Sequence, residues 1–166
     1  MARYSLGYTG KVMIATADGA PMTSNGYAAF LQGGNGTMQI KVNEVNVAGE
    51  SAASNPTTVA FGRDSTVAVT AITATGNQNA LLDGSGTAPA TIAVFGSGAT
   101  TNPSRSATLG RLLSPTLNGF GGIARWQARY GEEITMIGNT ASLGEVSLSA
   151  VTGTGQLSGH ILYELV

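Results

Sequence analysis

Acid–base chemistry in this sequence would have to use a single histidine, His160, and nine scattered carboxylates. Catalysis of the Ser-His-Asp type requires the imidazole ring to lie beside both a serine and a carboxylate. His160 precedes an apolar segment at 161–166 that alternates like a strand, so a ring that is packed or hydrogen-bonded at a strand end explains it better. We interpret His160 as a structural residue.

Metal and cofactor sites are not predicted either. The carboxylates are mostly isolated, and the adjacent Glu132 and Glu133 would point to opposite faces of a strand. The Gly-Ser-Gly segments at 84–86 and 96–98 precede no helix that could bind a phosphate, so we interpret them as turns. The absence of cysteine excludes disulfides and thiolate ligands. The sequence therefore predicts no catalytic, cofactor-binding or metal-ligating residue, although two carboxylates from distant strands could still converge as in a small hydrolase.

The elements that would position these residues are strands, because the hydrophobic pattern has a period of two. Met38, Ile40 and Val42 alternate with polar residues, and the alternation then shifts by one residue across Glu44 and resumes at Val45. Such a shift is typical of a β-bulge or of a bend in the strand. The expected strands are 11–15, 37–43 with a continuation to 47, 57–61, 66–73, 90–95, 122–129, 133–137, 145–150 and 160–166.

Turns and loops complete the expected architecture. We predict a hairpin turn at 62–65 and a single helical turn at 107–113. The many short strands indicate an all-β fold, a β-sandwich or jelly-roll-like domain. We assign 1–166 to one domain, with an extended arm or irregular lead-in at 1–36 and a β body at 37–166. The long irregular region at 96–122 is either a partner-binding loop or a tolerated insertion.

Charged residues are sparse, at 10% of the chain, where a typical globular domain has about 25%. The surface is therefore either a neutral polar one or one that partners cover, and we favour the second because interface cores are depleted in charge. Scattered arginines and a net charge of −1 do not form the basic stripe that nucleic acid requires. With no apolar run of membrane length and no leader, we expect synthesis in the cytoplasm and no membrane partner.

The last third of the chain carries a resemblance to a known family. Its segments are 123–128, which contains the only tryptophan, then 131–134, 138–139, 144–150 and 158–165. Together they resemble the closing strands of a viral jelly-roll surface domain. Over roughly residues 56–166, the chain is similar in style to decoration, or cement, proteins of tailed-bacteriophage capsids. The resemblance implies a non-enzymatic structural protein of the virion surface, a trimer that binds the major capsid protein outside an icosahedral shell.

We expect contacts with the shell or with sister subunits in the first ten residues and in the 96–122 region. The candidate contact residues are Arg3, Tyr4, Arg105, Arg111, Leu112, Leu113 and Phe120. Trp126 alternates within a strand and is predicted to belong to the core. The alternatives are a single-jelly-roll coat protein, a tail-tube subunit and a carbohydrate-binding β-sandwich, the last of which would need a platform of exposed aromatic rings.

Overall fold

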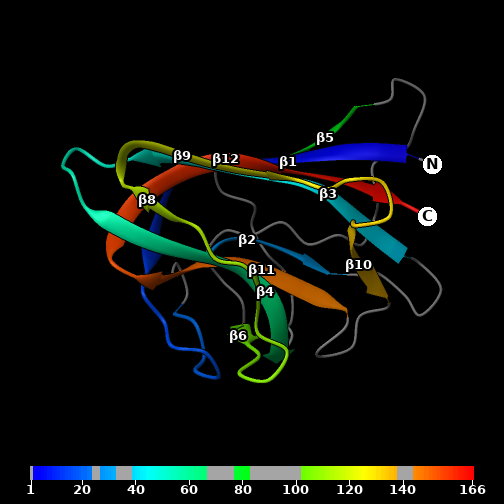
Figure 1. Ribbon diagram of the computed structural model, residues 1–166, viewed down its shortest axis with the longest axis horizontal. Coiled ribbons are helices and arrows are strands. Elements are labelled where there is room, and N and C mark those ends of the chain that lie inside the picture. The colour runs from blue at the N-terminus through cyan, green and yellow to red at the C-terminus, as the bar shows by residue number, and fades with distance from the viewer. Residues whose placement is uncertain (1, 24–26, 33–38, 67–76, 83–101, 138–143) are drawn as a thin grey trace.

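The computed structural model describes residues 2–23, 27–32, 39–66, 77–82, 102–137 and 144–166, which form two antiparallel β-sheets packed face to face (Figure 1). No helix occurs among these residues, and the expected all-β sandwich is confirmed. The part of the chain that the structure describes also contains no helix long and apolar enough to span a membrane.

Each sheet has six strands. The strands of the first sheet are β1 (Ala2–Ile14), β3 (Gln39–Glu50), β5 (Asn77–Leu81), β9 (Phe120–Gln127), β10 (Ile134–Ile137) and β12 (Thr154–Leu165). Their order is β10-β3-β12-β1-β5, with β9 also paired to β3. The strands of the second sheet are β2 (Tyr27–Gln32), β4 (Pro56–Thr66), β6 (Ser104–Arg105), β7 (Arg111–Leu113), β8 (Thr116–Asn118) and β11 (Glu145–Thr152). Their order is β2-β11-β4-β6, with β7 and β8 also paired to β4.

From β1 to β6 each strand lies in the sheet opposite to that of its predecessor, as do β9, β11 and β12, which gives the sandwich a jelly-roll-like winding. β3 pairs with β12 in the first sheet. The strands next to them in the chain, β4 after β3 and β11 before β12, pair with each other in the second sheet. β1 pairs with the other edge of β12 in the first sheet, and β2 pairs with the other edge of β11 in the second. The crossing between β11 and β12 occurs at Gly153, with φ of 75°, where an added Cβ would lie 2.5 Å from the carbonyl oxygen of Pro56.

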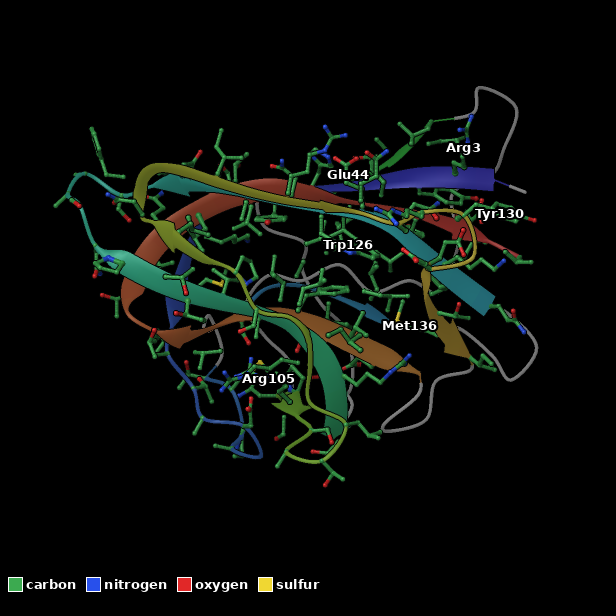
Figure 2. All side chains as sticks on the ribbon, viewed as in Figure 1. Arg3, Glu44, Arg105, Trp126, Tyr130 and Met136 are labelled. Carbon is green, nitrogen blue, oxygen red and sulfur yellow. The ribbon has the colours of Figure 1, made fainter. Side chains whose placement is uncertain are left out.

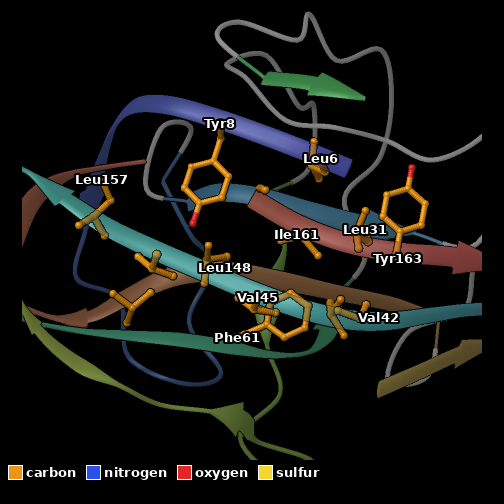
Figure 3. Packing of buried hydrophobic residues seen from close by; sticks show 14 of the residues in the cluster. Leu6, Tyr8, Leu31, Val42, Val45, Phe61, Leu148, Leu157, Ile161 and Tyr163 are labelled. Carbon is orange, nitrogen blue, oxygen red and sulfur yellow. The ribbon is translucent and has the colours of Figure 1, made fainter. Parts of the chain in front are cut away.

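The core lies between the sheets and is built from the inward positions of both (Figure 3). Ile161 and Tyr163 of β12 belong to the same buried cluster as Phe61 of β4 and Leu148 of β11, and each of the four is at most 1% exposed. Fully burying an apolar side chain of this size stabilises the fold by about 1.5–3 kcal/mol. Alternating apolar residues therefore account for the association of the two sheets.

The bulge predicted at Glu44 is confirmed. Leu162 pairs with Glu44, whereas the next residue, Tyr163, pairs with Val42, so Asn43 is the extra residue of β3. The insertion keeps apolar residues inward on both sides of the bulge and places Glu44 on the outer face of the first sheet.

The N-terminal residues do not form the expected arm. Residues 2–14 are β1, a central strand that pairs with β12 on one side and β5 on the other. Tyr4 and Leu6 are buried in the core, and the ring of Tyr4 stacks on Tyr163 with centroids 5.3 Å apart. Gly7 and Gly10 interrupt the sequence pattern. Gly7 is paired on both edges, with His160 and Gln78, which outweighs the low strand propensity of glycine, whereas Gly10 lies in an irregularity of the β1–β12 pairing with φ of 62°.

Residues 62–65 are not a hairpin turn, because β4 runs through them to Thr66. Gly62 is required by packing: an added Cβ would lie 2.7 Å from Cδ of Arg105, whose side chain crosses it. The predicted helical turn is confined to 107–109, where the N–H of Gly110 donates to the carbonyl oxygen of Ser106 at 3.1 Å, and residues 111–113 form β7 instead. His160 lies inside β12 rather than at its start. The described part of the 96–122 region contributes β6, β7 and β8 to the edge of β4. The strand predicted at 90–95 and nearly all of that at 66–73 lie outside the described residues.

Gly159 is expected to tolerate no side chain. An added Cβ would lie 2.0 Å from the backbone oxygen of Asn46 and 2.6 Å from Oη of Tyr8, the hydroxyl that donates to that oxygen at 2.8 Å. We expect Gly159→Ala to lower the free energy of unfolding by about 2–3 kcal/mol, measured by denaturant titration. Gly7→Ala is the matched control, since nothing lies within 4 Å of its added Cβ. Equal losses in the two variants would contradict this packing argument.

Candidate functional site

The predicted contact residues differ in how far they are buried. Arg3, Arg111 and Phe120 are exposed, and Leu112 and Leu113 are half-buried at the edge of the second sheet. Tyr4 and Arg105 are 2% and 0% exposed, so these two residues are withdrawn from the set of surface contacts. In the interior, the ring of Tyr4 stacks on Tyr163, and the guanidinium group of Arg105 forms an ion pair with Asp18.

Arg105 is the centre of a buried polar cluster where β6 and β11 meet the segment after β1 (Figure 2). Its Nε forms an ion pair with Asp18, Nη1 donates to Oγ of Ser149, and Nη2 donates to the carbonyl oxygen of Thr16 at 2.8 Å. Arg111 also binds Asp18, at 3.0 Å. Partial burial tends to raise the pKa of Asp18, but the hydrogen bonds and charges of the two arginines hold it below its ordinary value. The cluster ties two loops to the second sheet.

Asp64 and Glu145 form a buried carboxyl pair next to this cluster, and both are 0% exposed. Asp64 lies opposite Arg105 in the pairing of β4 with β6, and Oγ of Ser147 donates to its Oδ1 at 2.7 Å. Its Oδ2 accepts no hydrogen bond from the described residues, although Glu145 is close enough to influence its titration. Burial raises the pKa of Asp64 to about 6, against the opposing effects of Ser147, Glu145 and Arg105. This carboxyl pair is closed to any substrate in this structure.

A second ionic cluster lies on the outer face of the first sheet. Arg125 binds Glu44 through both Nε and Nη2, at 2.9 and 2.7 Å, and Nε2 of His160 lies 2.8 Å from the same carboxylate. Glu44 is only 4% exposed, and the Arg125 hydrogen bonds hold its pKa below the ordinary value despite partial burial. The His160 ring is therefore hydrogen-bonded, as we expected. The cluster links β9, β3 and β12 across three neighbouring strands.

A cavity of about 340 Å³ opens between the sheets beside β9. Trp126 lines it from the first sheet and Leu112 and Leu113 line it from the second, so the fold unites residues from two separate predicted regions. Trp126 is half-buried and packs against the core, in agreement with its predicted place there (Figure 2). The cavity was not predicted from the sequence, and the local signal for it is the small residue Ala124 at an inward position of β9.

Large apolar side chains are exposed along and beside β9. Phe120 and Ile123 of this strand are 62% and 72% exposed. Tyr130, just beyond the end of β9, is fully exposed (Figure 2). Of these residues, the sequence predicted only Phe120 as a contact, because the surface positions of a strand cannot be distinguished from its inward positions where both are apolar.

Among the described residues, no three histidine, aspartate or glutamate side chains gather as a metal site would require. Comparisons with protein-family models, with curated proteins and with solved structures found no match.

Proposed function

We propose that this protein is a non-enzymatic structural subunit of a bacteriophage virion, a trimer that decorates the outside of an icosahedral capsid. The supporting observation is the exposed apolar surface at β9, which we define as Phe120 and Ile123. Exposed apolar surface of this kind commonly marks a protein–protein interface. It occurs on a chain with only 10% charged residues, as is typical where partners cover the surface.

The charge distribution supports a position outside the shell. A protein that faces a packaged genome needs unpaired lysine and arginine to neutralise phosphates. Here the net charge is −1, and Arg105, Arg111 and Arg125 are already paired with carboxylates of the same chain. The partner that suits this surface is the major capsid protein, without contact to nucleic acid or membrane.

The proposed mechanism is stabilisation by mass action. A subunit that binds the assembled shell more tightly than its separate components shifts the equilibrium toward the assembled state. Pairing with β3 and the ion pair between Arg125 and Glu44 hold β9 in place before binding. A preorganised surface loses less conformational entropy when it binds, which favours a stable contact from a small area.

The exposed aromatic residues among the described part of the chain do not favour carbohydrate binding. Phe120 begins β9 and Tyr130 lies beyond its end, and a strand of eight residues spans roughly 26 Å. The two rings therefore lie too far apart to form one flat platform for a sugar chain.

The decisive experiment is sedimentation of the purified chain, alone and with shells of its virus from which the chain has been removed. We expect a trimer and saturable binding, both weakened by the double substitution F120S and I123S. Val12→Ser is the matched control, because Val12 is also exposed on the first sheet, at 57%. A monomer that does not bind shells would refute the proposal. Closed shells or stacked rings of this chain alone would indicate a coat or tail-tube subunit.

A further inference from the structure

We propose that the cavity beside β9 is a binding site for a neutral, apolar molecule of about one to two rings. Its innermost lining consists of Val45, Val47, Phe61 and Leu148, each at most 4% exposed. It is thus a depression that reaches the core. Protein partners usually bind flat surfaces of large area, whereas small ligands bind concave apolar sites such as this one.

The cavity is a consequence of the residues on the inward face of β9. Ala124 and Trp126 line the cavity from the inward face of this strand, and the side chain of Ala124 is only a methyl group. The opposite rim is formed by Leu112 and Leu113 of β7 and by the turn that follows. Protein interiors are normally packed as densely as organic crystals, so an unfilled space between two apolar rims is unusual. A bound molecule would complete the packing.

The lining indicates both the size and the charge of the ligand. An apolar cavity of about 150 Å³ suffices for benzene, so the 340 Å³ here accommodates a bicyclic molecule. Trp126 and Phe61 offer aromatic surfaces for offset or edge contacts. Arg125 also lines the cavity, but two of its nitrogens bind Glu44, at 2.9 and 2.7 Å, so its charge is already compensated. A neutral ligand is therefore favoured over an anion. This proposal does not depend on the decoration role.

Indole is a suitable probe, and methyl NMR of leucine and valine residues in the full chain is the measurement. We expect saturable shifts of the methyl groups of Val45, Leu113 and Leu148, which line the cavity. The methyl groups of Val12, exposed on β1, should not shift. The melting temperature should rise with indole concentration, because a ligand that binds only the folded chain stabilises it.

Two neighbouring substitutions test the location. Ala124→Leu fills the cavity and should raise the dissociation constant for indole by about tenfold or more. Ile123→Leu, on the exposed face of the same strand, should leave it unchanged. If A124L lowers the melting temperature, the smaller A124V provides the same test.

Three results would overturn the proposal. The first is the absence of saturable shifts, and the second is binding that A124L does not weaken. The third is a set of shifts at the same methyl groups that follows protein concentration without indole, which would mean that a second copy fills the cavity. Loss of shell binding with retained indole binding would refute the proposed function alone.

Discussion

Arg105→Met should lower the free energy of unfolding by about 3–5 kcal/mol, because it removes the charge that compensates buried carboxylates. Arg105 is 0% exposed, forms an ion pair with Asp18 and lies opposite Asp64. Methionine retains much of the side-chain length that covers Gly62. The loss of stability would therefore measure the missing charge and hydrogen bonds of Arg105 more than a change in packing. Denaturant unfolding at neutral pH is the measurement.

The matched control is Arg111→Met. Arg111 binds the same carboxylate of Asp18 at 3.0 Å, but its side chain is 36% exposed to solvent. Solvent-exposed ion pairs contribute about 0–1 kcal/mol, so this variant should lose little. Similar losses in the two variants would show that burial of Arg105 does not determine its contribution.

Asp64→Asn should gain stability relative to the natural chain as the pH rises from about 4 to about 7, by about 2–3 kcal/mol. Burial raises the pKa of Asp64 to about 6 in the folded chain, above its ordinary value of 3.8. In this interval the folded state binds the proton more tightly than the unfolded state. The natural chain therefore loses stability as the pH rises through the interval, and asparagine, which does not titrate, removes that loss.

Asp18→Asn supplies a control with the opposite sign. The pKa of Asp18 is held below its ordinary value by Arg105 and Arg111, in spite of partial burial. This carboxylate therefore stabilises the fold above pH 3.8 and loses that contribution as the pH falls through its lowered pKa. The D18N variant should be less stable than the natural chain at pH 7, and the deficit should shrink in acid. A constant difference between D64N and the natural chain at all pH values would contradict the raised pKa of Asp64.

The cluster around Arg105 also bears on the proposed assembly surface. Arg105 lies in β6, which the turn at 107–109 joins to β7, and Leu112 and Leu113 of β7 line the cavity opposite Trp126. Loss of the arginine should therefore disturb the cavity and the adjoining β9 edge as well as global stability.

Period-two alternation was enough to determine the all-β class, the bulge at Glu44 and, at least in part, the strands β3, β4, β9, β10, β11 and β12. Alternation is a local property, because successive side chains of any strand point to opposite faces. Trp126 was placed correctly for the same reason. Conversely, the alternation of Tyr4, Leu6 and Tyr8 was present but obscured by glycine, and only its pairing with β12 and β5 makes it a central strand.

The charged clusters, the cavity and the continuation of β4 through 62–65 were decided by tertiary structure alone. Arg105 is 87 residues from Asp18, and Arg125 is 81 residues from Glu44. Nothing in the local pattern indicates which cation meets which carboxylate, or that Gly62 is needed for an arginine side chain to cross it. These features depend on which strands become neighbours, and that choice is made by burial of the whole apolar face of each sheet rather than by any single segment.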